Sequence, residues 1–563
     1  MHRRIALFIF VFSAMLSPIQ AQLSLSPYSR YGLGDLYNPA STRNFSMGSV
    51  GIGIYDGSTI NRINPASYAD LRLTTLDINA FGIYTQQKSN LNTQSLGTSG
   101  FHNVSFGFSN KKGFGLVAGL APYSSTGYNV ISKHELQVDS VSEPYSVSYK
   151  SEGGLNQFYL GVGVRFVHKI FVGANLTYAF GTTTYTTSSV FENTGFNPVT
   201  IYSRSNLAGL LPQIGLQYGD TLKINTTVDR AKATQQDIKA VDAALRALDK
   251  EKAALEKEQV KAGNWEADQK KKIKAFTDEK LALETAIKRL MSNEDQNKKE
   301  IGQLQDKSYR IGKKRKKLER GVKARNREIQ DGFSFIAGRR KKLITRRETM
   351  EKELLEIASG KREATLQRKK TVLIRVGGVA EPVTNLSGSR ILEWDNTFVK
   401  DTLFNENGNV SLPMKYGFGF SLARSNRWMF GADFSYQDWS GFKFFDDGSN
   451  LNGALSVNVG GEWVPNLVST HYGDRIAYRL GGSYKSSFLS LDANPIKEYG
   501  ISFGLGLPIG RFNAVSASFS RVNLGVALSR RGTLNSNLLE ETTLQFRLGL
   551  NLNDVWFIKR VVD

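Results

Sequence analysis

Two groups of residues in this sequence have types and spacings that could do chemistry. The first is a pair of dense basic runs, formed by Lys313, Lys314, Arg315, Lys316 and Lys317, and by Arg339, Arg340, Lys341 and Lys342. Such runs attract an anionic partner, although a solvated helix face is the simpler alternative. The second group is Asn64, Pro65 and Ala66. Because proline fixes φ and lacks an N–H donor, this element predicts a sharp turn rather than a strand.

The usual patterns of catalytic and metal sites are missing. The sequence has no Cys, and its five His are far apart, so neither a thiolate site nor a histidine cluster is expected. It also lacks the Gly-x-Ser-x-Gly element of hydrolases and the Gly-Lys-Ser/Thr element of phosphate-binding loops. We therefore expect no enzyme activity, no cofactor and no metal.

The N-terminus predicts export from the cytoplasm. Two arginines precede an apolar stretch from Ile5 to Leu16, which is too short to span a bilayer, and Ala21 suits the last position before cleavage. Residues 1–21 are thus predicted to be a signal peptide, with an uncleaved anchor as the alternative. Beyond them no apolar run reaches the roughly 18 residues of a spanning helix.

The positive charge of the chain is concentrated in one block. The net charge is +22, and 41 of the 73 Lys and Arg but only 24 of the 51 Asp and Glu fall within residues 222–370. Residues 298–370 alone hold 25 basic and 10 acidic side chains. The flanking chain is nearly balanced and carries most of the 53 Gly, 33 Phe and 22 Tyr. These two compositions predict a basic insertion at 224–370 inside a Gly- and aromatic-rich domain.

The flanking chain alternates apolar and polar residues with the period of a β-strand. Every second residue is apolar from Phe158 to Phe166 and again from Leu544 to Leu552. The strands are about ten residues long, enough to cross a bilayer at a tilt, and their polar side is rich in small residues. Since a closed barrel is the one sheet that satisfies its backbone in lipid, the pattern predicts a transmembrane barrel rather than a soluble sandwich.

Fourteen strands are predicted, six in residues 71–223 and eight in residues 371–563. Short turns alternate with longer loops, including 128–156 and 386–411, and short turns face the periplasm in outer-membrane barrels. The 224–370 insertion replaces a short turn, so we expect it in the periplasm. That compartment excludes nucleic acid as its partner and leaves phospholipid headgroups, an anionic envelope polymer or an acidic protein.

The insertion is predicted to be helical. Good helix formers dominate it, and apolar residues recur at steps of three and four, as at Val241, Leu245 and Leu248. The pattern is coiled-coil-like but too irregular for one strict coiled coil. One hairpin with arms of about 70 residues, each about 100 Å long, and several shorter helices are both consistent with it.

The segment before the first strand carries a Gly-rich stretch at 48–53 and the Asn-Pro-Ala element at 64–66. An exported N-terminus with these elements ahead of a fourteen-strand pattern resembles the FadL-type outer-membrane transport family. The resemblance covers residues 22–223 and 371–563, and the helical insertion departs from it.

What the resemblance implies is a fourteen-stranded barrel whose N-terminal segment, here residues 22–70, plugs the lumen as a hatch. Asn64, Pro65 and Ala66 are implied to belong to that hatch. The implied activity is passive uptake of hydrophobic compounds such as fatty acids across the outer membrane.

Two functions therefore stay open. The first is uptake of a hydrophobic small molecule, with outer-membrane lipid and the ligand as partners. The second is a structural or accessory role in an outer-membrane complex, in envelope assembly or the barrel assembly machinery. In that role the insertion would dock periplasmic or outer-membrane proteins.

Overall fold

The computed structural model describes residues 26–554 except for short gaps, which fall at 111–112, 139–140, 192–196, 292–293, 364, 397, 425–426, 446, 449, 468, 470 and 514–517. The predicted signal peptide lies outside the described residues. The chain forms two compact units, a β unit built from both flanking parts and a helical unit that spans 225–369.

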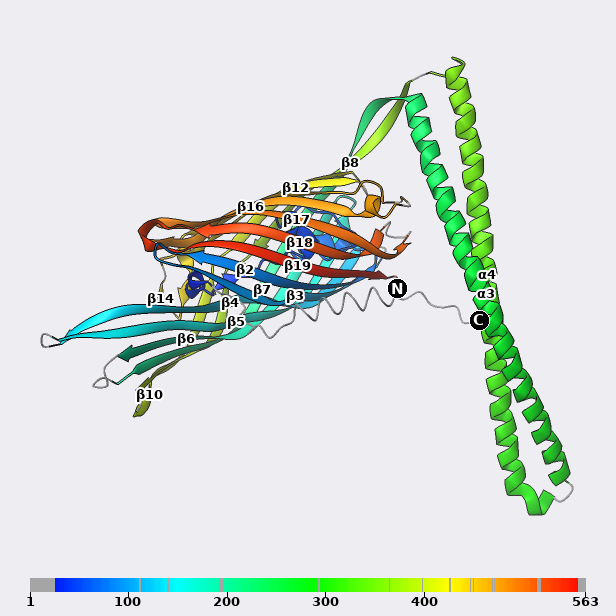
Figure 1. Ribbon diagram of the computed structural model, residues 1–563, viewed down its shortest axis with the longest axis horizontal. Coiled ribbons are helices and arrows are strands. Elements are labelled where there is room, and N and C mark those ends of the chain that lie inside the picture. Colours follow the sequence, from blue (N-terminus) through cyan, green and yellow to red (C-terminus); the bar gives the residue numbers. More distant parts are fainter. Residues whose placement is uncertain are drawn as a thin grey trace. The chain divides into compact units, whose positions relative to one another are not determined.

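Within the described residues, 14 antiparallel strands form one closed barrel, as the sequence predicts. Figure 1 shows them running side by side. Their bounds are β2 (Thr74–Lys88), β3 (Thr93–Asn110), β4 (Phe114–Val138), β5 (Val141–Val167), β6 (Ile170–Phe191), β7 (Val199–Asp229), β8 (Thr365–Glu381), β11 (Lys415–Arg424), β12 (Trp428–Asp438), β15 (Gly453–Trp463), β16 (Ala477–Leu491), β17 (Asn494–Asn513), β18 (Ser518–Gly532) and β19 (Glu540–Asp554).

Two sets of pairings close the sheet. The last strand, β19, pairs with the first barrel strand, β2, from Glu540 opposite Lys88 to Asp554 opposite Thr74. Across the insertion, β7 neighbours β8, and β8 pairs with β11. Among the described strands the barrel has no edge, so their backbone groups pair within the sheet.

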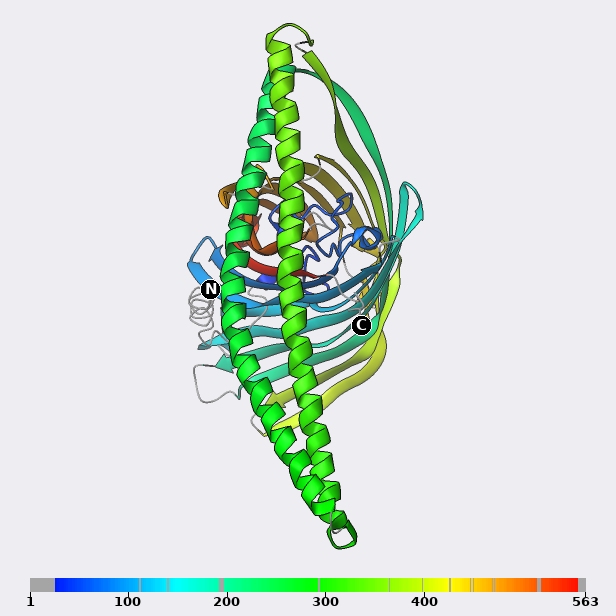
Figure 2. The same cartoon turned by 90° about the vertical axis from the view of Figure 1, so that its right-hand side faces the viewer.

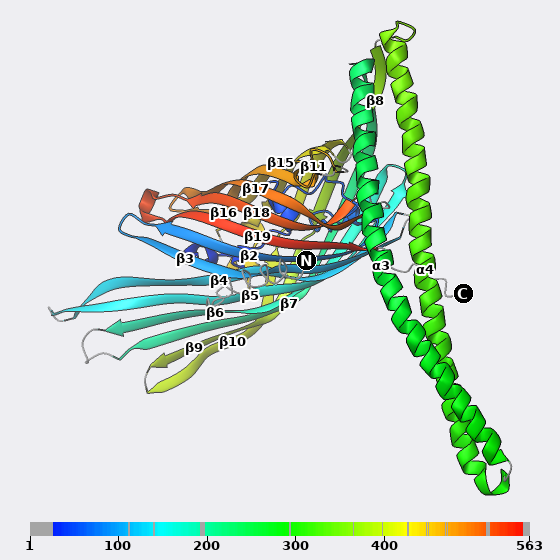
Figure 3. The same ribbon diagram turned by 45° about the vertical axis from the view of Figure 1, so that its right-hand side comes forward.

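Three hairpins extend far beyond the barrel at the end opposite the short turns (Figure 3). They are β4–β5, β6–β7 and the additional pair β9 (Thr384–Asn396) and β10 (Val399–Leu412). β9 pairs with β7 on one side and with β10 on the other, so the hairpins form one continuous sheet. The expected long loops at 128–156 and 386–411 are therefore wrong, because most of their residues are strand. Short strands β13 (Lys443–Phe444) and β14 (Asp447–Gly448) complete this end.

The outward face of the barrel is apolar. On β5 the large side chains Phe158, Leu160 and Phe166 are exposed, whereas the neighbouring Tyr159 is buried inside. Exposed apolar side chains also cover β6, β7, β11 and β12, and they form a surface suited to lipid tails. The chain is thus an outer-membrane β-barrel.

The polarity of the two faces reverses along the same strands. Toward the extended end of β5, the outward positions become Ser146, Ser148 and Lys150, with no register shift between them and Phe158. The inward positions there are Tyr145 and other apolar residues. Because successive side chains alternate between faces, this reversal marks where the lipid-facing belt ends.

The helical unit is an antiparallel pair of long helices. α3 runs from Arg230 to Leu290 over 61 residues, and α4 runs from Glu294 to Ala358 over 65 residues. At 1.5 Å per residue each is about 90–100 Å long. The single hairpin is thus the alternative that the structure adopts. None of the helices in the described part of the chain is long and apolar enough to cross a membrane.

The contact between α3 and α4 follows a seven-residue repeat. In α3 the buried positions Thr234, Val241, Leu248, Ala262 and Gln269 are separated by seven or fourteen residues, and the buried Ala233 lies directly before the first of them. Most buried positions of α4 show the same spacing, at Ile301, Ser308, Val322, Ile329, Ile336 and Met350, and one more, Ile311, lies three residues after Ser308. A contact repeat of seven residues is the geometry of two helices that wrap around each other.

A charged substitution tests where the lipid belt ends. Leu160→Arg should lower the free energy of unfolding by about 2–4 kcal/mol, since it places a guanidinium among lipid tails. Ser148→Arg, on the same face of β5 but past the polarity reversal, should leave it nearly unchanged. Chemical denaturation in phospholipid vesicles measures both, and equal losses would contradict the assigned boundary.

Candidate functional site

The N-terminal segment, residues 26–73, lies inside the ring of strands (Figure 2). We call it the plug. It contains the 3₁₀ helix η1 (Pro27–Arg30), the short strand β1 (Asp35–Leu36), the helix α2 (Thr42–Phe45) and the 3₁₀ helix η2 (Pro65–Asp70). β1 pairs with β4 inside the barrel, through Asp35 opposite Ser125. Most plug residues from Ala40 onward are buried, so the plug fills the lumen.

Glycines of the barrel wall let the plug backbone come very close. A Cβ added at Gly481 would lie 2.0 Å from the backbone nitrogen of Gly48, and one at Gly173 would lie 2.3 Å from the carbonyl carbon of Pro65. Such distances leave no room for any side chain. The small residues on the polar side of the strands therefore serve packing against the plug rather than an open lumen.

Side chains of three wall strands hold the centre of the plug. Asp433 of β12 accepts hydrogen bonds from the N–H groups of Gly51 and Ile52, at 2.6 and 2.9 Å. Gln217 of β7 donates to the Ile52 carbonyl at 2.8 Å, and Ser421 of β11 donates to the Gly53 carbonyl at 2.6 Å. The backbone at 51–53 is thus fixed to the wall from several sides.

A buried charge cluster holds the plug at the short-turn end. Glu462 of β15 accepts two hydrogen bonds from Arg43 of the plug, both at 3.1 Å, and one from Arg479 of β16 at 2.7 Å. Arg43 also pairs with Asp56 at 2.9 Å. Arg43 is 6% exposed and Arg479 1% exposed. Removing one partner from such a buried pair leaves an uncompensated charge and is strongly destabilising.

The structure places Asn64, Pro65 and Ala66 at the start of η2. The Asn64 side chain caps this 3₁₀ helix by accepting from Ala66 N–H at 3.0 Å. Its amide group donates to the Ile52 carbonyl at 2.8 Å and to the Leu216 carbonyl of β7 at 3.2 Å. Asn64 therefore joins two parts of the plug to the wall, and whether it belongs to a gate stays a prediction.

The basic runs lie on α4, in the other unit, so the structure does not bring them together with the Asn-Pro-Ala element. All their side chains are exposed except that of Arg315, which is half-buried. Arg315 pairs with Glu319 of the same helix at 3.5 Å, and Arg340 pairs with Asp249 of α3 at 3.3 Å. The two runs keep a large surplus of positive charge.

A cavity of about 320 Å³ lies between the plug and the wall at the extended end of the barrel. Tyr28, Tyr37 and Phe488 give it an apolar side, and Glu381 and Lys415 a charged one. Tyr28 donates from its hydroxyl to the Leu539 carbonyl. Burial raises the pKa of Tyr28 to about 12, so this group stays a donor at neutral pH.

Next to this cavity, the inward face of the extended sheet is aromatic. The rings of His134, Tyr145 and Phe191 stack across β4, β5 and β6, with centroids 5.3 Å apart in each pair. Arg30 of the plug lies over the Tyr149 ring, 5.9 Å from its centroid. The pairing registers place further apolar residues on the same face, namely Val147, Ile201, Leu392, Trp394 and Phe404. We call this surface the aromatic wall.

Sequence reasoning missed the residues that lock the plug. Glu462 and Asp433 are carboxylates on the small, polar side of their strands, which is the one signal that could have found them. Their partners in the plug are more than 350 positions away in the sequence, so no local pattern could pair them. Among the residues that the structure describes, no group of three or more His, Asp or Glu side chains could hold a metal ion.

A family model named BamG matches residues 1–339 and 300–563. The chain belongs to the BamG family. The fourteen-strand barrel that the sequence resemblance implies is confirmed, and the N-terminal segment lies inside it (Figure 2). No curated protein matches this member of the BamG family.

Several solved structures share weak similarity with this BamG-family chain. They include the CymD monoaromatic hydrocarbon channel, with 10% identity, a TM-score of 0.42 and coverage of 93% of this chain and 99% of that one. The Pseudomonas putida toluene transporter TodX has 10% identity, a TM-score of 0.41 and coverage of 92% and 99%. A Pseudomonas aeruginosa FadL homologue has 8% identity, a TM-score of 0.43 and coverage of 92% and 98%. Scores this low carry no information on function.

Neutralising Glu462 should release the plug. Glu462→Gln leaves Arg43 and Arg479 without their shared carboxylate, a loss of about 3 kcal/mol or more in plug docking. Because the chain has no Cys, Ser46→Cys introduces a single buried reporter that a polymer-linked maleimide reaches only when the plug opens. Labelling should become roughly 100-fold faster.

Glu498→Gln is the matched control for that change. Glu498 lies on β17, pairs with Lys485 at 3.4 Å and does not contact Arg43. Its removal should leave the labelling rate of the reporter unchanged. Equal rates in Glu462→Gln and in the unsubstituted protein would show that the charge cluster does not hold the plug.

Proposed function

We propose that this protein is a non-catalytic structural subunit of an outer-membrane complex. The barrel anchors the chain, the plug closes the lumen, and the helical hairpin reaches into the periplasm to dock an acidic protein. The observation that carries the proposal is the surplus of positive charge on α4, displayed on a hairpin whose helices are about 90–100 Å long.

The charges of the two helices differ in how they are neutralised. On α3, ion pairs within the helix cover several lysines, such as Lys270 with Glu266 at 3.0 Å and Lys272 with Asp268 at 2.8 Å. On α4, residues 313–317 hold five basic side chains. Within the described residues, one of these side chains forms an ion pair, that of Arg315 with Glu319. Exposed, unpaired cations favour a polyanionic surface as partner.

Other features support a structural role over free passage. The plug is fixed by the Glu462 cluster and by the hydrogen bonds at 51–53, and at Gly173 and Gly481 its backbone lies directly against the wall strands. Both ends of the hairpin connect to barrel strands, β7 and β8, and each of its helices is about 90–100 Å long. Of the two functions that the sequence leaves open, the family name BamG hints at the second, an accessory role in outer-membrane assembly.

The cavity of about 320 Å³ beside the aromatic wall favours a second candidate, uptake of hydrophobic small molecules. Such a ligand would bind the aromatic wall, enter the cavity, and pass only if the plug moved. CymD and TodX are described as channel and transporter for aromatic hydrocarbons, but their similarity to this chain is too weak to decide.

Removing the surplus charge tests the docking role. Replacing Lys313, Lys314, Lys316 and Lys317 with Gln should cut co-purification of envelope proteins in mild detergent by about tenfold, and added salt should weaken it in the unsubstituted protein. Quantitative mass spectrometry of the purified complexes measures this. The barrel and its plug should stay folded.

The control replaces Lys270, Lys271, Lys272 and Lys274 of α3 with Gln, which removes the same number of charges from the neutralised helix. Co-purification should then persist. If both variants keep their partners, docking by α4 is excluded. If the α4 variant instead loses binding to isolated cell-wall sacculi or to anionic vesicles, the partner is a polymer or lipid rather than a protein.

A further inference from the structure

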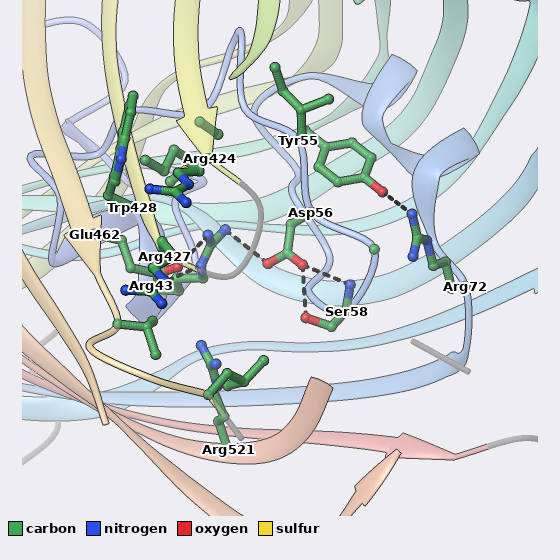
Figure 4. A pocket seen from close by; sticks show the side chains of 16 residues that line it. Arg43, Tyr55, Asp56, Ser58, Arg72, Arg424, Arg427, Trp428, Glu462 and Arg521 are labelled. Carbon is green, nitrogen blue, oxygen red and sulfur yellow. Dashed lines mark hydrogen bonds and ion pairs between the residues drawn. The ribbon is translucent and has the colours of Figure 1, made fainter. Parts of the chain in front are cut away.

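A pocket of about 150 Å³ at the short-turn end of the barrel is lined by arginines (Figure 4). They come from the plug and from three separate strands or turns, and they are Arg43, Arg72, Arg424, Arg427 and Arg521. Two carboxylates, Asp56 and Glu462, line the same pocket. The pocket therefore has more cations than its own anions can neutralise.

The carboxylates of the pocket are already engaged. Glu462 bonds to Arg43 and Arg479, and Asp56 pairs with Arg43. Within the part of the chain that the structure describes, Arg424, Arg427 and Arg521 have no carboxylate within ion-pair distance. These three guanidinium groups are free to bind an external anion.

Water does not satisfy all the hydrogen-bond donors of Arg521. Its Nε atom is buried and has no hydrogen-bond partner among the described residues, and Arg424 is half-buried. A buried donor without a partner costs about 1–3 kcal/mol, and more when the group is charged. An anion in the pocket would supply the missing acceptor and the missing negative charge.

The aromatic side chains around the pocket indicate where it lies relative to the membrane surface. Trp428, which lines the pocket, lies opposite Trp463 in the β12–β15 pair, and the ring of Trp463 contacts that of Tyr478 at 5.7 Å. Trp428 is 38% exposed and Trp463 56% exposed. Exposed Trp and Tyr at strand ends mark the membrane–water boundary, where lipid headgroups lie.

We propose that this pocket binds a phosphate group, presented by the headgroup of an anionic phospholipid in the adjoining leaflet. Arg424, Arg427 and Arg521 would hold the phosphate oxygens, because the planar guanidinium fork suits phosphate. Leu373, Met429 and Val464 give the pocket an apolar side for the attached glycerol and acyl groups. The site lies wholly in the barrel unit and does not depend on the docking role of the hairpin.

Calorimetric titration of the full-length protein in neutral detergent tests the proposal, with short-chain phosphatidylglycerol, short-chain phosphatidylcholine and inorganic phosphate as probes. Phosphatidylglycerol should bind once per chain and at least tenfold more tightly than phosphatidylcholine. The double substitution Arg424→Gln with Arg427→Gln should weaken it at least tenfold, and so should Arg521→Met alone.

The matched control is Lys133→Gln with Arg204→Gln, which removes two exposed cations from the outward face at the opposite end and should not change the affinity. Unchanged circular dichroism and thermal unfolding show that each variant is folded. Tight binding of inorganic phosphate with the same sensitivity to Arg424 and Arg427 would support the site with free phosphate as the source. Equal affinity for the two lipids without phosphate binding, or an unchanged affinity in all arginine variants, would overturn it.

Discussion

The pairing of β19 with β2 is the constraint on which the rest of the structure depends. Fifteen residues of β2, Thr74–Lys88, lie in this pair, so the sheet closes on itself and the backbone groups of both strands pair with each other rather than face lipid. Closure turns one face of every strand outward toward lipid tails and the other toward an enclosed lumen. The apolar exposure of Leu160 and the buried charge of Arg479 are the two results of that division.

An enclosed lumen must then be filled or remain wet, and here the N-terminal plug fills it. The plug enters before the first barrel strand, so its backbone lies in the lumen with its polar groups matched by the wall. Asp433, Gln217 and Ser421 supply those partners at the centre, and Glu462 neutralises the cation that the plug brings in. This close fit requires glycine in the wall, since Gly173 and Gly481 tolerate no side chain.

The strands and their number follow from the sequence because lipid requires an apolar residue at every second position. This two-residue period is visible from Phe158 to Phe166 and in the other membrane-spanning strands. The extended sheet was missed for a related reason. Past the membrane boundary the apolar residues move to the other face, as at Tyr145, Val147 and Tyr149, which breaks the expected pattern without breaking the strand.

The contact repeat of the hairpin was missed because polar residues occupy part of it. Thr234, Gln269 and Ser308 sit at buried heptad positions, so hydrophobicity alone does not show the seven-residue spacing. The site residues were harder still. A charge such as Glu462 is visible in its strand, but Arg43 lies 419 positions away and only the closed fold brings the two together.

The central claim is that the plug closes the barrel, so that the barrel serves as a structural anchor rather than a channel. The flux of a small solute through the unsubstituted protein tests this claim. The purified chain would be placed in proteoliposomes, and entry of a small hydrophobic solute would be compared with entry into vesicles that hold no protein. The account predicts equal rates in the two, with no conductance across a planar bilayer that holds the same protein. Entry that rises with the amount of protein would contradict it and favour uptake.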